Sequence, residues 1–397
     1  MMHSILRMIP GLSALRGRVR AAFFRALSRV ASIEDTRSIL SNELERQNLV
    51  TCPKELSACD FAPPYLELQR SQETPRRKRS CAIFITARFR SGSTLVWNVF
   101  RRLPGVTAYY EPFNERRWFD VRNRGSEVDP THINVSDYWS EYDGLEELGN
   151  HFDERWKFEH LYMPEDAWNP AMEQYIRILI ERARGRAVLQ FNEVDMRLPW
   201  LRAKFPGAKI LHVFRHPREQ WCSTLPKGSP QLMGLTLSEF EKIDGFYLLR
   251  WGRDLRHYFP FLTLQPDAHP YELFYQIWKI SYLFGCFHAD CSVAFEQIAN
   301  EPRSTLQRMF SAMGLEEYDL DSLVRVVQPQ HGLRWTESPD AGRFAMIEAK
   351  VDAMFESYTA RIPPSTHAHS RFSVESGAGR GDSDCQGPDS VGSQAIS

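Results

Sequence analysis

The chain has few cysteines and no long apolar run. Its 397 residues include seven cysteines, and no two of them show the C-x-x-C spacing of a structural zinc site. A sparse, odd-numbered set in a chain of this length fits a reducing compartment, so we interpret the cysteines as ordinary thiols. No stretch of about 18 apolar residues occurs, so no membrane-spanning helix is expected. Arginines at positions 16, 18 and 20 interrupt the place where a signal peptide would be apolar, which makes the cytoplasm the default location.

The chain also lacks an overall excess of charge. Its formal net charge is -1, which argues against a general nucleic-acid-binding protein. Positive charge is nevertheless concentrated near the start, where no acidic residue precedes Glu34. Residues 12–30 place apolar side chains at helical spacing with arginines largely on the other faces, which predicts a basic amphipathic helix within residues 1–50. Two roles fit such a helix: peripheral contact with an anionic membrane surface, or packing on its own domain or a partner subunit.

The rest of the sequence divides into three parts. Residues 51–80 contain four prolines among polar residues and are predicted to form an extended linker. Residues 363–397 are rich in Ser, Gly and Asp and are predicted to be a disordered tail. Residues 81–362 alternate between short apolar runs and helical patterns, which predicts an α/β domain with a parallel sheet covered on both faces. The expected strands are 81–87, 106–110, 187–191, 209–214 and 292–295, and the expected helices are 93–102, 172–184 and 302–313.

An anion-binding loop is predicted directly after the first strand. The loop and helix start read Arg90, Ser91, Gly92, Ser93, Thr94. Glycine lets the backbone turn sharply, the first N–H groups of the helix are free to bind an anion, and the arginine and hydroxyls add donors. The usual nucleotide-triphosphate loop is not present, because no lysine follows Gly92. The alternative is a simple turn in which Ser93 caps an ordinary helix.

A second candidate site follows a later strand. The strand 209–214 is followed by Arg215 and Pro217, and Ser223 lies eight residues after Arg215. Ligands of open parallel sheets collect at the carboxyl ends of the strands, where both this arginine and the first loop are expected. The alternative is that Arg215 forms an ordinary surface ion pair.

Together the two segments resemble the sulfotransferase family that uses 3′-phosphoadenosine 5′-phosphosulfate as its donor. The resemblance implies a three-layer, P-loop NTPase-like fold with a central parallel sheet flanked by helices. It implies that Arg215 and Ser223 bind the 3′-phosphate, and that no metal is needed where cationic side chains and helix N–H groups take the charge. The residues that would cradle the 5′-phosphosulfate are Arg90, Ser91, Gly92, Ser93 and Thr94.

Some features refine or depart from this pattern. Arginine at position 90 is closer to the carbohydrate-type and bacterial members than to the lysine-bearing steroid and phenol enzymes. The segment 293–315 is similar to a further family element, with Phe295 in place of the more usual tyrosine. The family's late glycine-rich loop, which closes over the adenosine, has no clean counterpart, and residues 332–335 are the nearest stretch.

Glu111 is the first candidate for the base. It directly follows the second strand, so it should lie at the same edge of the sheet as the phosphate loop, and carbohydrate-type members use a glutamate in a similar Glu-Pro context. Arg90 is the candidate that stabilises the leaving group. The alternative for Glu111 is an ion pair with Arg90 or Arg88, and Glu115 is the second candidate base. We expect His212 to be a buried, hydrogen-bonded core residue.

The sequence therefore predicts a sulfotransferase that acts on a hydroxyl or amine of a carbohydrate or small metabolite. One alternative is a P-loop kinase, which should have a lysine after Gly92 and acidic magnesium ligands. The other is a non-catalytic module that binds adenosine bisphosphate and needs no base. His216 stands where the family more often has aspartate, and we expect it to cap the turn there. The aromatic residues of 225–287 are expected mainly in the core and do not identify the acceptor.

Overall fold

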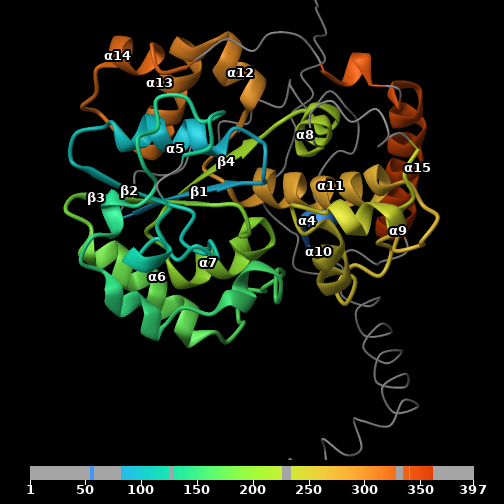
Figure 1. Cartoon of the computed structure of the whole chain (residues 1–397), viewed down its shortest axis with the longest axis horizontal. Coiled ribbons are helices and arrows are strands. Elements are labelled where there is room, and N and C mark those ends of the chain that lie inside the picture. Colours follow the sequence, from blue (N-terminus) through green and yellow to red (C-terminus); the bar gives the residue numbers. More distant parts are fainter. Residues whose placement is uncertain are drawn as a thin grey trace, which may run out of the picture. The chain divides into compact units, whose positions relative to one another are not determined.

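Five parallel strands form the centre of the fold (Figure 1). The structure is a computed structural model. It describes residues 54–57, 82–125, 128–225, 234–327, 334–338 and 340–360, which all lie within one compact unit. The strand order is β2-β3-β1-β4-β5, and every neighbouring pair is parallel. This confirms the predicted α/β class. The strands are β1 (Ala82–Ala87), β2 (Val106–Tyr110), β3 (Arg186–Phe191), β4 (Lys209–Phe214) and β5 (Cys291–Ala294).

Helices cover both faces of this sheet. Figure 1 shows α5, α12 and α13 on one side and α6 and α7 on the other, while α11 contacts β4, β5 and α7. Coverage on both faces explains why the strands are nearly continuous apolar runs. The described α-helices are α4 (Lys54–Ser57), α5 (Ser93–Arg101), α6 (Pro170–Arg182), α7 (Leu198–Lys204), α8 (Pro217–Thr224), α9 (Leu237–Phe240), α10 (Leu248–Leu255), α11 (Pro270–His288), α12 (Phe295–Asn300), α13 (Pro302–Met313), α14 (Leu320–Val324) and α15 (Ala341–Ala360).

A long excursion separates β2 from β3. Before α6 it is built from 3-10 turns rather than α-helices or strands. The described 3-10 turns of the whole chain are η1 (Val121–Asn123), η2 (Ser140–Tyr142), η3 (Glu146–Asn150), η4 (Glu154–Lys157), η5 (Asp195–Arg197), η7 (Glu241–Ile243) and η8 (Arg334–Glu337). The aromatic side chains of the excursion between β2 and α6 pack into the core around the sheet, so the excursion is an integral part of the domain.

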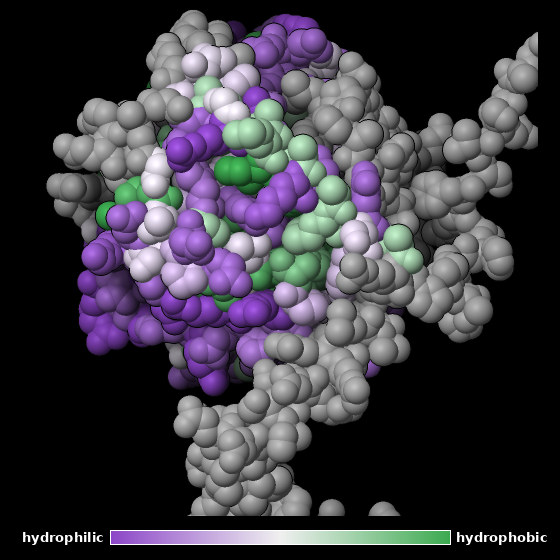
Figure 2. Space-filling model, turned by 90° about the vertical axis from the view of Figure 1, so that its right-hand side faces the viewer, coloured by the Kyte–Doolittle hydropathy of each residue, from purple (hydrophilic) through white to green (hydrophobic). Residues whose placement is uncertain are grey.

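The core has two parts. One surrounds the sheet, and the other surrounds α11, whose side chains are nearly all buried. The aromatic side chains of 225–287 lie mainly in the second part, as expected, and Trp251, Tyr275 and Trp278 are fully buried there. On the face shown in Figure 2, which is the right-hand side of Figure 1, hydrophobic groups lie between hydrophilic ones. None of the described helices is long and apolar enough to cross a bilayer.

Most predicted elements lie where the sequence placed them. β2, β4 and α13 have the predicted bounds, and β5 ends one residue early because Phe295 begins α12. The predicted linker 51–80 differs at α4, where Leu56 is fully buried and Glu55 accepts a hydrogen bond from His288 at 2.7 Å. This short helix therefore packs on α11 instead of running extended. The predicted amphipathic helix at 12–30 and the tail from 363 lie outside the described residues.

Candidate active site

The predicted anion-binding loop joins β1 to α5. Arg90 and Gly92 both have left-handed backbone conformations, with φ of 65° and 90°. The turn is closed by Ser91, whose N–H and hydroxyl both donate to the carbonyl of Arg88, at 3.2 and 2.6 Å. The N-cap of α5 is Gly92, not Ser93, so no side chain caps the helix. The first N–H groups of α5 are thus open to an anion, as the phosphate-loop prediction requires.

Gly92 is fixed sterically as well as conformationally. A Cβ atom at this position would lie 2.1 Å from Cδ2 of Phe295, so only glycine fits. The same Phe295 ring lies under the guanidinium of Arg215, at 4.9 Å from its centroid. Phe295, which stands where the family more often has tyrosine, therefore contacts both the anion-binding loop and Arg215.

The residues expected to bind the donor come together. Arg215 donates to the carbonyl of Arg90 at 3.3 Å, and the Arg90 Nε lies 3.1 Å from the carbonyl and 3.2 Å from the hydroxyl of Ser223. Arg215 also donates to Glu219 at 3.4 Å. Glu219 is fully buried, so this interaction is not the surface ion pair considered as the alternative. Two arginines, a serine and a helix N-terminus thus converge at the carboxyl ends of β1 and β4.

His216 has a different role from the one expected. It occupies the N-cap position of α8 but makes no side-chain capping hydrogen bond. Its ring stacks on Trp335, with centroids 6.1 Å apart and an interplanar angle of 8°. Trp335 also lies under the guanidinium of Arg218, and its main-chain N–H donates to Glu219 at 3.2 Å. The stretch nearest to the family's late loop therefore reaches Glu219, the partner of Arg215, at Trp335, while residues 332 and 333 lie outside the described residues.

Glu111 is buried at the end of β2. Its carboxylate accepts hydrogen bonds from the side chains of Asn114 and Asn192, and it also bonds to Tyr110. Burial raises the pKa of Glu111, and these hydrogen bonds together with the positive charge of Lys157 oppose that rise. The expected alternative, an ion pair with Arg90 or Arg88, is not among these interactions. Glu111 is thus a buried carboxyl group whose ionised form is stabilised by hydrogen-bond donors.

A hydrogen bond connects this carboxyl group to the phosphate loop. The hydroxyl groups of Thr94 and Tyr110 lie 2.9 Å apart, and Tyr110 also bonds to Glu111. The two halves of the site therefore share one hydrogen-bonded path across β2 and α5. Such a path fixes the position of the candidate base relative to the first turn of α5.

Sequence reasoning missed two charged residues near Glu111. Glu193 follows β3 and is buried, and Lys157 of η4 is buried although it is a lysine. Lys157 forms an ion pair with Glu115, the second candidate base, whose side chain is half exposed. The position of Glu193 directly after a strand was a usable signal, but nothing in the sequence pattern pointed to Lys157.

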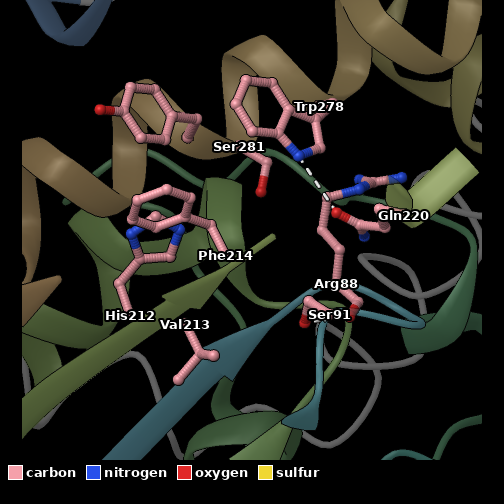
Figure 3. A pocket seen from close by; sticks show the side chains of 9 residues that line it. Arg88, Ser91, His212, Val213, Phe214, Gln220, Trp278 and Ser281 are labelled. Atoms are coloured by element: carbon pink, nitrogen blue, oxygen red, sulfur yellow. Dashed lines mark hydrogen bonds between the residues drawn. The ribbon is translucent and has the colours of Figure 1, made fainter. Parts of the chain in front are cut away.

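A small cavity lies beside the predicted anion-binding loop and is lined by Arg88 and Ser91 (Figure 3). Arg88 points into it, with its guanidinium over the Trp251 ring, and burial lowers its pKa to about 10. His212 lines the same cavity, where it bonds to the Ser292 hydroxyl at 2.7 Å, and burial lowers its pKa to about 3. This confirms His212 as a buried, hydrogen-bonded core residue.

Three of the six described non-glycine residues with positive φ lie at or near the site, and the other three, Arg117, Asn134 and His160, are not site residues. Glu111 and Tyr247 have positive φ values of 40° and 62°, in addition to the 65° of Arg90. Tyr247 contacts the segments that carry Arg90 and Glu111. Its ring centroid is 6.3 Å from that of Phe89, and its hydroxyl donates to Glu115. Non-glycine residues in this conformation cost free energy and cluster at functional sites.

Comparison with known proteins places these features in one family. A sequence profile described as the sulfotransferase family matches residues 82–277, which include the phosphate loop, Glu111 and Arg215. Among solved structures, sulfotransferase STF9 from Mycobacterium avium is 12% identical, with a TM-score of 0.37, over 70% of this chain and 78% of that one. A sulfotransferase from Alicyclobacillus acidocaldarius is 15% identical, with a TM-score of 0.34, over 71% and 97%. The sulfotransferase domain of the Synechococcus PCC 7002 olefin synthase is 14% identical, with a TM-score of 0.31, over 73% and 98%. No curated protein matches the sequence.

Proposed function

The chain belongs to the sulfotransferase family, and from that premise we propose that it uses 3′-phosphoadenosine 5′-phosphosulfate to sulfate a hydroxyl, or an amine, of a carbohydrate or small metabolite. The observation that carries this proposal is the convergence of Arg90, Arg215 and Ser223 at the open N-terminus of α5. This donor set suits a ligand with two separate anionic groups.

The residues present fit such a donor. The main-chain N–H groups at the start of α5, with Ser93 and Thr94, would bind the 5′-phosphosulfate. Arg215 and Ser223 would bind the 3′-phosphate. Gly92, which lacks a Cβ, lets the ligand approach the backbone closely. We assign to Arg90 the charge that develops on the oxygen between phosphorus and sulfur.

Glu111 is assigned the role of base. In the reaction a bond forms between the acceptor atom and sulfur, the bond from sulfur to the bridging oxygen breaks, and the bisphosphate leaves with that electron pair. The acceptor loses one proton, which Glu111 accepts. Burial suits Glu111 to this task because it raises the pKa of the carboxyl group toward neutrality. The hydrogen-bonded path through Tyr110 and Thr94 holds it beside the bound donor.

Calorimetric titration with adenosine 3′,5′-bisphosphate tests the donor site. We expect it to bind much more tightly than ATP or AMP, and Arg215→Ala to weaken binding by about 10–100-fold, because charge-assisted hydrogen bonds to phosphate are lost. Arg177→Ala, on the exposed side of α6, is the matched control. Tight ATP binding that ignores the 3′-phosphate would favour the kinase alternative instead.

Two further proposals concern location. We propose a cytoplasmic protein, which the sparse, odd-numbered set of cysteines in the sequence supports. Residues 12–30 are proposed to contact an anionic membrane surface. The test is flotation of the full chain with phosphatidylserine vesicles, beside a chain in which the arginines of this segment are changed to glutamine. Equal flotation of both chains would exclude the electrostatic contact.

A further inference from the structure

Two buried carboxyl groups and a buried lysine lie together beside the proposed base site. Glu111, Glu193 and Lys157 are 7%, 3% and 3% exposed. β2 and β3 are parallel neighbours with Tyr110 opposite Gln190, so Glu111 and Glu193 leave the sheet at the same edge. Because a charged side chain is costly to bury, three of them in one place require an explanation.

Asn192 bridges the two carboxyl groups. Its side-chain amide donates to Glu111, and its main-chain N–H donates to Glu193 Oε2 at 3.2 Å. The two groups are not held equally, since Glu111 also receives hydrogen bonds from Asn114 and Tyr110. The other oxygen of Glu193, Oε1, is buried and has no hydrogen-bond partner among the described residues. Donors therefore favour the ionised form of Glu111 more than that of Glu193.

Lys157 is held in place against this pair. Its carbonyl accepts a hydrogen bond from the Trp251 indole at 2.9 Å, and its ammonium group lies 4.4 Å from the centroid of the Tyr247 ring. The ammonium also pairs with Glu115, and its charge acts on both Glu111 and Glu193.

The surrounding elements add few other charges. Burial and the neighbouring Glu111 raise the pKa of Glu193 to about 7, whereas Lys157 and Arg197 oppose that rise. Burial also lowers the pKa of Lys157, with a smaller contribution of the same sign from Arg250. The titratable or charged groups around the cluster are Tyr110 at the end of β2, Glu111 and Glu115 after it, Tyr138 before η2 and Tyr142 of η2, Lys157 of η4, Glu193 after β3, Arg197 of η5, Tyr247 at the N-cap of α10, and Arg250 of α10.

We propose that Glu193 and Lys157 are positioning residues for the base: Glu193 holds the one proton that the two buried carboxyl groups share, and Lys157 balances the charge left on Glu111. The two buried carboxyl groups then take different roles, because the negative charge on Glu111 makes ionisation of Glu193 unfavourable. Glu111 stays free to accept the proton of the acceptor. The inference rests on the proposed function only for that last role, since the sharing of the proton is a property of the folded chain.

A titration of the carboxyl groups tests the inference directly. The full chain is labelled with 13C at the glutamate carboxyl carbon, and the signals of Glu111 and Glu193 are assigned with Glu111→Gln and Glu193→Gln. We expect Glu193 to titrate near pH 7 and Glu111 at lower pH. Lys157→Met should raise the midpoint of Glu111 by about one pH unit or more, since an opposite charge within a few ångströms shifts a carboxyl by this amount.

Matched variants separate this effect from a change in packing. Lys157→Arg keeps the charge and should leave the midpoint of Glu111 within half a unit of its original value. Lys242→Met removes an exposed lysine and should change neither midpoint. Should Lys157→Met fail to fold, Glu193→Gln still decides the question: its spectrum must lose the titration near pH 7. The inference is wrong if both carboxyl groups titrate together below pH 5, or if Lys157→Met leaves the midpoint of Glu111 unchanged.

This outcome is distinguishable from a failure of the proposed function. Split titration without bisphosphate binding would remove the sulfotransferase assignment and leave the shared proton standing. Bisphosphate binding without split titration would keep the donor site and overturn the roles of Glu193 and Lys157.

Discussion

The donor side of the site is built from cations and main-chain N–H groups, whereas the base side is built from buried carboxyl groups. Arg90 and Ser223 on the donor side are half-buried and can meet a ligand from solvent. Glu111 and Glu193 on the base side are almost fully buried, and their charge is controlled by neighbours within the protein. The contrast implies that changes on the donor side alter affinity, while changes on the base side alter rate and pH dependence.

The largest expected effect separates rate from affinity. Glu111→Gln should slow sulfuryl transfer by about 10²–10⁴-fold, because general-base catalysis contributes that factor, while the dissociation constant of the bisphosphate stays unchanged. The measurement is transfer of labelled sulfate to an acceptor found by screening. Glu115→Gln is the control and should have a much smaller effect. A greater loss in Glu115→Gln would transfer the base role to that residue.

The next effect is a change in the pH dependence of the free energy of unfolding, caused by Glu193 on the base side. The folded pKa of Glu193, about 7, exceeds the ordinary 4.5, so the folded chain binds more protons between these pH values and loses stability as pH rises through them. Glu193→Gln cannot ionise and lacks this loss. Its free energy of unfolding relative to the parent should rise by on the order of 3 kcal/mol between pH 4.5 and 8. Urea denaturation at several pH values measures this.

Glu181→Gln, an exposed change on α6, provides the control for this prediction. It should give a stability curve parallel to that of the parent. A parallel curve for Glu193→Gln as well would mean that Glu193 is ionised throughout, and the contrast between the two sides of the site would then fail.

A third variant tests how rigidly the donor side is built. Gly92→Ala must adopt a φ of 90° and place its Cβ against Phe295, so we expect it to lose roughly 2 kcal/mol of stability and to bind the bisphosphate more weakly. Gly144→Ala is the matched control, because its φ is 77° and nothing lies near its Cβ. It should lose only roughly 1 kcal/mol. Equal losses of stability in the two variants would show that the Phe295 ring moves aside without a measurable cost in free energy.

The smallest effect is expected at Ser223. Ser223→Ala removes one neutral hydroxyl and should weaken bisphosphate binding by about 2–10-fold, since a neutral hydrogen bond contributes only about 1 kcal/mol. The pH dependence of transfer should not change. Ser136→Ala, at an exposed position, is the control. A shift of the pH profile in Ser223→Ala would show that the two sides of the site are more strongly coupled than their hydrogen-bonded path suggests.

The two sides also differ in how far the sequence predicts them. The proposed donor side consists of contiguous residues, Arg90 to Thr94, and of an arginine directly after a strand, so strand prediction and helix-terminus chemistry were sufficient to predict it. Ser223 came from the family resemblance, and the structure brings it to Arg90.

The base side was predicted only in part. Glu111 was predicted as the base because it follows β2, and the same argument applied to β3 would have indicated Glu193. Lys157 could not be found in this way, because it lies in the excursion between β2 and α6, whose described residues form neither strands nor α-helices. Its approach to Glu111 depends on the packing of Trp251 and Tyr247, which are about 90 residues further along the chain. Trp335 likewise reaches His216 only through tertiary packing.

The left-handed backbone at Arg90, Glu111 and Tyr247 has a consequence for protein engineering. Each of these side chains sits on a conformation that glycine or asparagine adopts with less strain, by about 1–2 kcal/mol for glycine. A library selected for heat resistance alone would therefore favour replacing them, and at Arg90 and Glu111 it would remove the side chains proposed to act in transfer. Selection for thermostability should hold these three codons constant and draw its gains from ordinary helix and surface positions.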